Sequence, residues 1–267
     1  MTSPLEDIDF LARSEHRVAA LRTLREGPGD RDALRGVTDA SNATTARLLT
    51  EFEERNWVVR NGNEYELTDP GAFVADEFLR LVDRMETEHA LRDVWQWFPT
   101  ELPGCTMSLF VGAVVSWPDP RLPYRPFPRF VELIESAGIH RGFTKATPKP
   151  KTYEVWQRIL DGGGELDFVF PAFVVGVFLE EVSEKTIRDA VESGRLALST
   201  HDSLPTNAGV STFGDHVVVF CRDDERVSRA MVDTDTPEAV AWAKSRYEEI
   251  RSEASPVDPI ERLDRGV

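Results

Sequence analysis

Residues that could recognise DNA bases gather in one stretch of the sequence, SNATTARLLTEFEER (41–55). An Asn amide suits the edge of adenine, an Arg guanidinium suits guanine, and Ala or the methyl group of Thr suits the thymine methyl. The residues predicted to meet base edges in this way are Asn42, Ala43, Thr44 and Arg47. The eleven residues from Ala40 to Thr50 contain no carboxylate, in a chain with 47 Asp and Glu. This pattern indicates a surface kept free of negative charge for a polyanion.

A helix over this stretch separates two faces when its residues are placed at intervals of about 100°. The face expected in the core holds Thr45, Leu48, Leu49 and Phe52. The opposite face holds the predicted base contacts and Thr50, which would lie nearer the DNA backbone, and Ser41, a favoured N-cap residue, completes the predicted DNA-binding set. The acids that follow, Glu51, Glu53 and Glu54, would lie farthest from the phosphates in a helix that enters the major groove N-terminus first.

The elements around this helix are predicted by apolar spacing and by turn residues. A first helix is expected over 8–25, which GPGD ends, and a second over 31–37, which Asp30 can cap. After the third helix, WVVR and EYELT flank an Asn-Gly turn and predict a β-hairpin. Three helices and a hairpin in this order are typical of a winged helix-turn-helix. The hairpin residues expected to reach the minor groove or phosphates of double-stranded DNA are Arg60, Asn61 and Asn63.

A long helix is predicted over residues 71–98. Its apolar residues Val74, Phe78, Leu81 and Met85 recur at intervals of four, three and four, which suits a helix that packs along a partner. This stripe could be the seam of a homodimer or could pack on the back of the winged helix. We favour the homodimer, because proteins that read the major groove commonly bind paired half-sites about 34 Å apart.

Beyond a Pro-rich break, predicted strands alternate with predicted helices. The strands are AVVSW, IHRGFT, ELDFVF, RLALST, HVVVF and SRAMVD, and the helices span 127–137, 152–161, 172–180, 184–193 and 237–252. The predicted fold class is α+β, with an N-terminal winged helix-turn-helix, a long linker helix and a C-terminal α/β domain. The predicted boundaries are 1–70 for DNA binding, 71–100 for the linker or dimerisation helix, 101–256 for the α/β domain and 257–267 for a flexible tail.

A basic segment lies in the second half, between Arg121 and Lys151. It holds seven Arg and Lys and His140 against two Glu, whereas the whole chain has a net charge of −16. Fixed cations attract anions, so this segment is a candidate site for a small anionic effector. Two other interpretations stay open, namely ion pairs to acids of the same molecule and added contacts to DNA phosphates. The predicted effector-binding residues are Arg125, Arg129, Arg141, Lys145 and His201.

Composition narrows the classes of protein to consider. The 267 residues include 47 Asp and Glu against 31 Lys and Arg, and only five Lys. This balance resembles proteins of organisms with molar intracellular salt, where charge repulsion is screened within about 3 Å; an ordinary acidic cytosolic protein is the alternative. Cys105 and Cys221 have no CxxC or nearby His, so we expect free thiols, no metal and no cofactor. Without a leader-like start or a long apolar run, we expect a soluble cytoplasmic protein that does not contact membranes.

The stretch SNATTARLLTEFEERNWVVRNGNEYELTDPG resembles the recognition helix and wing of archaeal winged-helix regulators of the ArsR and MarR type. Their usual form is a Ser, a Thr three residues on, an Arg, then Leu and LEERGWV. This chain matches it at Ser41, Thr44, Arg47, Leu49, Phe52 and EERNWV. Asn56 replaces the usual Gly, and Asn tolerates the left-handed backbone expected at this turn.

The rest of the chain resembles archaeal regulators, abundant in haloarchaea, that carry the middle domain first described in a methanogenesis regulator (FilR type). The stretches that carry this resemblance are PYRPFPRFVELIESAG, ESGRLALSTHDSLPTNAGVSTFGDHVVVF and TPEAVAWAKSRYEEIRSEASPV. It implies a C-terminal domain that senses a signal. The region around His201 is also distantly similar to half of a phospholipase D fold. That chemistry needs a Lys two residues after the His, where this chain has Ser203.

The residues and the resemblances together predict a sequence-specific DNA-binding transcription regulator, homodimeric and not an enzyme. Charge depletion alone is a weak signal, since 16–25 also lacks acids, but a capped, acid-free helix followed directly by a hairpin favours DNA binding. Two alternatives stay open. One is a divergent phosphodiesterase with His201 as its nucleophile, and the other is a winged helix that binds a protein partner.

Overall fold

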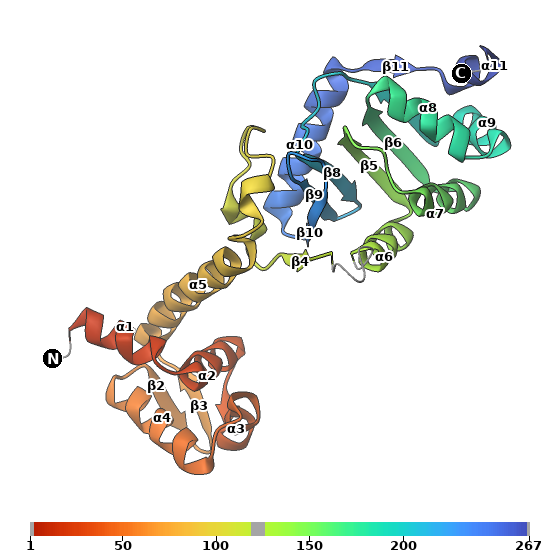
Figure 1. The fold of residues 1–267 in the computed structure, drawn as a ribbon. Coiled ribbons are helices and arrows are strands. Elements are labelled where there is room, and N and C mark those ends of the chain that lie inside the picture. Colours follow the sequence, from red (N-terminus) through yellow and green to blue (C-terminus); the bar gives the residue numbers. More distant parts are fainter. Residues whose placement is uncertain (1–2, 119–125, 266–267) are drawn as a thin grey trace. The chain divides into compact units, whose positions relative to one another are not determined.

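The computed structural model of the chain describes residues 3–118 and 126–265 (Figure 1). Arg125, one of the predicted effector residues, and Arg121 of the basic segment lie outside the described residues. The chain divides into two compact units, Met1–Glu86 and Thr87–Val267.

The first unit begins with four helices, α1 (Pro4–Ala12), α2 (Glu15–Glu26), α3 (Arg31–Thr38) and α4 (Asn42–Glu54). The single helix predicted over 8–25 is wrong, because the chain breaks at Ser14, whose backbone is extended (φ −142°, ψ 111°). Ser is a favoured N-cap residue, so a new helix can begin there. The sequence did not reveal the break, because so short a break leaves the spacing of the apolar residues almost unchanged. The other two predicted helices are confirmed.

Side-chain caps fix where α3 and α4 begin. Asp30 Oδ1 accepts a hydrogen bond from the Ala33 amide (2.8 Å), and Ser41 Oγ accepts one from the Thr44 amide (3.2 Å). Both predicted N-caps are therefore confirmed. Just beyond α4, Asn56 adopts the left-handed backbone expected for it (φ 56°).

The predicted hairpin is present as β2 (Val58–Asn61) and β3 (Glu64–Leu67), which pair antiparallel, and β1 (Gly29–Asp30) adds a third strand beside β3. The core of the unit is formed by apolar residues of the helices and of this small sheet. The predicted core face of α4 is confirmed, since Thr45, Leu48, Leu49 and Phe52 are all buried.

Helix α5 (Asp69–Leu91) is shorter than the helix predicted over 71–98. Beyond Leu91 the chain turns through a short 3-10 helix (Trp95–Trp97), and Val94 and Phe98 are buried in a core of the second unit. Burial of these two side chains in a different core explains why the helix does not continue.

The apolar stripe of α5 divides between buried and exposed residues. Val74 and Phe78 pack in the core of the first unit. Leu81 and Met85, further along the same stripe, are 52% and 48% exposed. The interpretation that the stripe packs on the back of the first unit therefore holds for its first half.

The start of α5 lies very close to the residues that lead into β2. Gly71 donates its amide hydrogen to Thr68 Oγ1 (3.1 Å). A Cβ atom at Gly71 would lie 1.8 Å from the carbonyl oxygen of Trp57. Only glycine fits this contact, which packs the start of α5 against the turn between α4 and β2.

The second unit is built on an eight-stranded sheet with the order β11-β7-β6-β5-β8-β9-β10-β4. Its strands are β4 (Val114–Ser116), β5 (Ile139–Thr144), β6 (Glu165–Phe170), β7 (Leu196–Thr200), β8 (Ala208–Phe213), β9 (His216–Arg222), β10 (Ser228–Thr234) and β11 (Ser255–Val257). β5, β6 and β7 are parallel, and the other pairs are antiparallel. The six predicted strands are confirmed.

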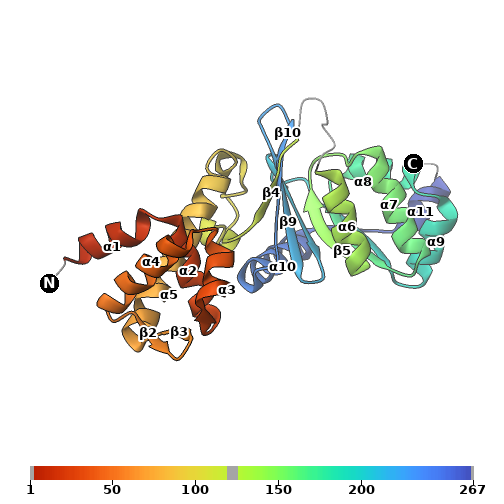
Figure 2. The same ribbon diagram turned by 90° about the horizontal axis from the view of Figure 1, so that it is seen from below.

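Helices cover both faces of this sheet, as Figure 2 shows for α6 to α9 on one side and α10 on the other. The helices are α6 (Phe127–Ala137), α7 (Pro150–Asp161), α8 (Ala172–Glu181), α9 (Glu184–Glu192), α10 (Pro237–Glu253) and α11 (Pro259–Arg265). Alternate residues of a strand enter different cores: Phe168 and Phe170 face α6 to α9, and Val169 belongs to the core that includes α10.

Two segments of this unit differ from the sequence prediction. No strand is predicted over 208–213, where β8 runs with all its residues buried. β5 and β8 approach each other closely at two glycines: a Cβ atom at Gly142 of β5 would lie 2.5 Å from the Val210 carbonyl oxygen, and one at Gly209 of β8 would lie 2.9 Å from Thr144 Cβ. The flexible tail predicted over 257–267 is corrected by α11, whose Leu263 packs against the core. Seven residues are too few for apolar periodicity to reveal such a helix.

Candidate nucleic-acid interface

The outer face of α4 presents the residues predicted to meet base edges. Asn42, Ala43 and Arg47 are exposed, and Thr44 is half-buried. The side chain of Arg47 is 72% exposed. Thr50 is also exposed, near the C-terminal end of this face. The helix therefore brings the predicted residues to one surface, opposite its buried face.

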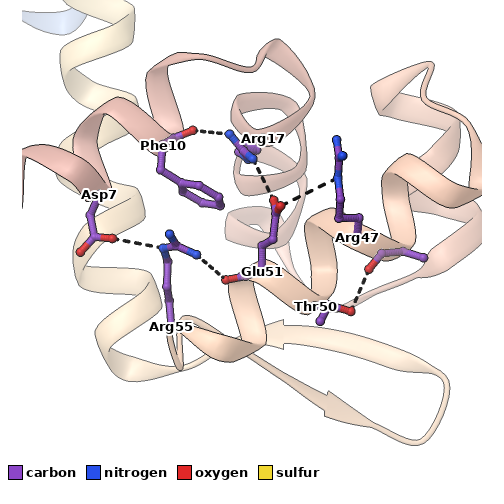
Figure 3. Close-up of polar contacts among 8 residues, drawn as sticks. Asp7, Phe10, Arg17, Arg47, Thr50, Glu51 and Arg55 are labelled. Atoms are coloured by element: carbon purple, nitrogen blue, oxygen red, sulfur yellow. Dashed lines mark hydrogen bonds and ion pairs between the residues drawn. The ribbon is translucent and has the colours of Figure 1, made fainter. Parts of the chain in front are cut away.

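The hydroxyl groups of α4 are already hydrogen-bonded within the helix. Ser41 Oγ and Thr44 Oγ1 lie 3.0 Å apart in the N-cap. Thr50 Oγ1 donates to the Ala46 carbonyl oxygen (3.1 Å; Figure 3). Ser41 therefore has a structural role in the cap. The groups of this face that remain available to a ligand are the amide of Asn42, the guanidinium of Arg47 and the methyl groups of Ala43 and Thr44.

Arg35 on α3 joins this surface, although sequence reasoning missed it. Its Nη1 donates to Asn42 Oδ1 (2.9 Å), and its Nη2 lies 3.4 Å from Asp32. The Asn42 oxygen keeps a second lone pair, and its NH₂ group has no hydrogen bond among the described residues, so both ends of the amide can still bind. An Arg in the helix before a predicted recognition helix is the signal that could have found this contact.

Glu51 is the acid nearest in sequence to this face, and its charge is neutralised within the first unit. Arg17 Nη2 lies 2.8 Å from Glu51 Oε2, whereas Arg47 Nε lies 3.8 Å from Glu51 Oε1 (Figure 3). Arg17 and Glu51 are both mostly buried, and Arg47 is mostly exposed. The stronger pair is therefore the one with Arg17, which leaves Arg47 only weakly held.

The ring of Phe10 holds Arg17 in place from α1. The guanidinium carbons of Arg17 and Arg55 each lie 3.7 Å from the centroid of this ring. Arg17 Nη1 also donates to the Phe10 carbonyl oxygen (2.6 Å), and Arg55 pairs with Asp7 (3.1 Å; Figure 3). Two cation–π contacts and these hydrogen bonds fasten α1 to α4. Sequence reasoning missed this cluster, because its members lie far apart in the chain.

The hairpin turn carries one exposed cation and two exposed amides. Arg60 Nε donates to the Gly62 carbonyl oxygen (2.9 Å), and Asn63 is exposed. The side chain of Asn61 donates to the carboxylate of Glu66 on β3. The tip, RNGN (60–63), contains no acid, but the fold brings Glu66 of the neighbouring strand to Asn61.

The predicted effector residues that the structure describes do not form one cluster. Arg129 pairs with Glu132 (3.3 Å) and with buried Asp233 (3.0 Å), and Arg141 lies 3.7 Å from Glu165. Lys145 is half-buried in the loop after β5. Two members of the basic segment therefore form ion pairs within the molecule, one of the interpretations left open by the sequence.

His201, the predicted nucleophile of the enzyme alternative, lies beside a carboxylate. Its Nδ1 accepts a hydrogen bond from the Ser203 amide (3.0 Å), and its Nε2 lies 3.7 Å from Glu253. A negative charge at this distance would repel a phosphodiester.

A cavity of about 260 Å³ lies in the second unit, lined by α6, α7, β5, β6 and β8 to β10. None of Arg129, Arg141, Lys145 and His201 is among the described residues that line it. The basic segment contributes His140 and Lys149 instead, and β9 contributes Arg222.

Several other kinds of site find no support among the described residues. They contain no group of three His, Cys, Asp or Glu side chains that could hold a metal ion. Within the same residues, no helix is long and apolar enough to cross a membrane. Cys105 and Cys221 are free and buried, and burial raises the pKa of each thiol to about 12. Thiols with such pKa values are poor nucleophiles.

Comparison with known families gives two matches. Residues 5–90 match a family model described as the HVO_A0261 N-terminal domain. Residues 123–253 match the model of the middle domain of the methanogenesis regulatory protein FilR1. These matches support an archaeal transcription-regulator family. The resemblance of the second half to the methanogenesis-regulator middle domain is thereby confirmed. A regulator family also suggests a protein that does not act as an enzyme.

Comparison with curated proteins gives no match. Among solved structures, the archaeal chromatin protein TrmBL2 is similar at 15% identity over 96% of this chain and 100% of its own, with a TM-score of 0.43. NucT of Helicobacter pylori (11% identity) and the phospholipase D family member Nuc of Salmonella typhimurium (13%) each cover 54% of this chain, and 98% and 97% of their own, with TM-scores of 0.40. All three scores are low.

Proposed function

We propose that this protein is a sequence-specific DNA-binding transcription regulator whose first unit acts as a winged helix-turn-helix. The observation that carries the proposal is the outer face of α4. It is free of carboxylates up to Thr50, and the next acid, Glu51, is paired with Arg17. A helix that enters the major groove needs such a face, because phosphates repel acids at its N-terminal end.

The role that we propose for each residue follows from which of its groups are not already hydrogen-bonded. The amide of Asn42 and the guanidinium of Arg47 would read base edges, and the methyl groups of Ala43 and Thr44 would pack against thymine. Arg60 and Asn63 of the hairpin turn would contact the backbone or the minor groove. Ser41 and Thr50 would act by positioning the helix, since their hydroxyls are already hydrogen-bonded.

Substitution of Arg47 tests this assignment. Arg47→Ala should weaken specific binding by about 1 to 3 kcal/mol without unfolding the protein, because one bidentate contact to guanine is lost. The measurement is a mobility shift at fixed salt on a duplex first selected from random sequences by the intact protein.

Arg13→Ala is the matched control, since Arg13 is similarly exposed but pairs with Asp9 on α1. It should bind the selected duplex as the parent does. Equal affinity of Arg47→Ala and the parent protein would remove Arg47 from the base-reading set.

We also propose that the protein is a homodimer held in part by α5. The support is its exposed apolar pair, Leu81 and Met85, which continues the stripe begun by buried residues. Leu81→Glu should shift the sedimentation coefficient from that of a dimer to that of a monomer, because two charges would oppose each other across the symmetry axis.

Leu5→Glu is the control for this substitution, since Leu5 is an exposed leucine of α1. It should leave the sedimentation coefficient unchanged. A monomeric parent protein, or a dimeric Leu81→Glu variant, would contradict the proposed seam.

The second unit is proposed to sense a small effector. The match to a regulatory protein's middle domain supports a regulatory role for this unit, and its cavity of about 260 Å³ supports a ligand of modest size.

A further inference from the structure

The cavity of the second unit is elongated along the strands of the sheet. His140 of β5 and Arg222 of β9 both line it, and β8 lies between these two strands. Thr212 of β8 pairs with Arg141 on one side and with Val217 on the other. Counted from this row, His140 lies one residue back and Arg222 five residues on, so six residues separate the two along the strands. At about 3.3 Å per residue, the lining extends over about 20 Å.

Arg222 lies at the end of the cavity where β5 ends and α7 begins. β5 ends at Thr144, whose row in the sheet includes Phe220, and Arg222 follows two residues later on β9. α7 starts at Pro150, and Thr152 of its first turn also lines the cavity. The positive end of the α7 dipole is therefore at the same end as the guanidinium. We call this the cationic end of the cavity.

The guanidinium of Arg222 gives the cationic end a buried hydrogen-bond donor. Its Nη1 is buried and has no hydrogen-bond partner among the described residues. Burial lowers the pKa of Arg222, but a guanidinium stays charged even so. A buried donor without an acceptor costs free energy, and the cost is greater when the donor is charged. A ligand with a negatively charged acceptor would remove this cost.

The opposite end of the cavity, which we call the aromatic end, consists of rings that surround His140. The centroids of Phe130, Trp156 and Phe168 lie 5.9, 5.7 and 4.6 Å from that of His140. Trp156 Nε1 already donates to His140 Nδ1 (2.9 Å), so the indole offers a ligand only its apolar carbon atoms. An apolar group that leaves water for these walls is stabilised by burial.

We infer that this cavity binds an amphipathic carboxylate of medium length, with the carboxylate at Arg222 and an unbranched apolar tail directed toward Trp156. The volume of about 260 Å³ equals that of about nine water molecules in the liquid, which suits about nine or ten non-hydrogen atoms. Octanoate is of this size. Trp156 lies six residues beyond Pro150 in α7, about 9 Å along the helix axis, a distance that an eight-carbon chain can span. This inference rests on the sensing role proposed above and names its ligand class.

Calorimetric titration of the full-length protein without DNA tests the ligand class. Octanoate should give saturable binding with a Kd of about 1 mM or tighter. Hexanoate lacks two CH₂ groups and should bind at least about tenfold more weakly, since each buried CH₂ changes affinity about fourfold. Octanamide keeps the tail without the charge and should also bind at least about tenfold more weakly. No binding of octanoate, or equal binding of hexanoate or octanamide, would overturn the inference.

Substitution of Arg222 tests the position of the carboxylate. Arg222→Gln should weaken octanoate binding by about tenfold to a hundredfold, since a charge-assisted hydrogen bond is lost. The same substitution should leave octanamide binding unchanged. Arg229→Gln is the matched control, because Arg229 lies on the adjacent strand β10, pairs with Asp223 and is not among the described residues that line the cavity. Equal weakening of octanoate binding by both substitutions would overturn the assignment.

A nuclear magnetic resonance measurement on the parent protein tests the position of the tail, even if Arg222→Gln does not fold. Octanoate should shift the assigned indole N–H signal of Trp156, whereas acetate, which has the carboxylate without the tail, should not. An unchanged Trp156 signal at saturating octanoate would place the tail elsewhere and overturn the inference. Because no DNA is present, failure of the proposed operator binding would leave these results unaffected. Operator binding without octanoate binding would remove the ligand class alone.

Discussion

Glu51 is the first acid after the residues of α4 that we propose to read bases, and its partner determines how freely Arg47 can move. Arg17 holds Glu51 at 2.8 Å, and Arg47 lies 3.8 Å from the same carboxylate. We predict that Arg17→Gln frees Glu51 to pair with Arg47. Specific DNA affinity should then fall by about 1 kcal/mol, the upper end of the range for exposed ion pairs. A fluorescence anisotropy titration with the selected duplex measures this effect.

The double variant Arg17→Gln with Glu51→Gln separates this electrostatic effect from damage to packing. It should recover the parent affinity, because no charge is left to compete for Arg47. Continued weak binding of the double variant would show that Arg17 acts through the position of α1, by its contact with Phe10.

For single residues, the sequence predicted the features that depend on residues close by in the chain. The caps at Asp30 and Ser41 and the left-handed Asn56 were predictable, because each depends on residues within one helical turn. The roles of Arg17 and Arg35 were not, because their partners lie on other helices. The cavity was missed for the same reason, since His140 and Arg222 come from different strands.

Among the elements, α5 depends on one close contact at its start. A Cβ atom at Gly71 would lie 1.8 Å from the Trp57 carbonyl oxygen, whereas one at Gly36 in α3 would meet nothing within 4 Å. Gly71→Ala should therefore destabilise the first unit by more than about 2 kcal/mol, since backbone must move. Gly36→Ala should stabilise it by about 0.5 to 1 kcal/mol, the difference in helix propensity.

Urea unfolding of the full-length variants, followed by circular dichroism, measures both changes. The pair controls for the general effect of Gly→Ala in a helix. If Gly71→Ala were as stable as Gly36→Ala, α5 could not be packed against Trp57 as described.

Element boundaries were predictable where long apolar patterns stand between clear turn residues. β5, β6 and α6 have the predicted bounds. β8 was not predicted, because Ala208, Gly209 and Ser211 interrupt the branched residues typical of strands, and Gly209 lies where a Cβ atom would be 2.9 Å from Thr144. The break at Ser14 and the helix α11 escaped prediction because each is too short to alter an apolar period.

The molecule as a whole carries a net charge of −16, with only 31 cationic side chains. Mutual repulsion of the carboxylates destabilises a compact chain. Salt weakens this repulsion by shortening the screening length from about 10 Å at 0.1 M to about 3 Å at 1 M. We predict that the thermal midpoint rises between these KCl concentrations at neutral pH. Differential scanning calorimetry measures the rise.

The same experiment near the isoelectric point is the control. There the net charge approaches zero, so screening should no longer stabilise the chain. A midpoint that falls with KCl at neutral pH would contradict the interpretation of the acidic composition as an adaptation to salt.

The order in which the cavity walls occur along the chain has a consequence for synthesis. The described lining runs from Pro126 to Met231, and it joins parallel strands with antiparallel ones. A ribosome releases the whole of the first unit, which ends at Glu86, before it makes any of these walls. A nascent chain would therefore complete the first unit, with α4, well before it could complete the cavity, whose walls arrive only with the last strands of the sheet.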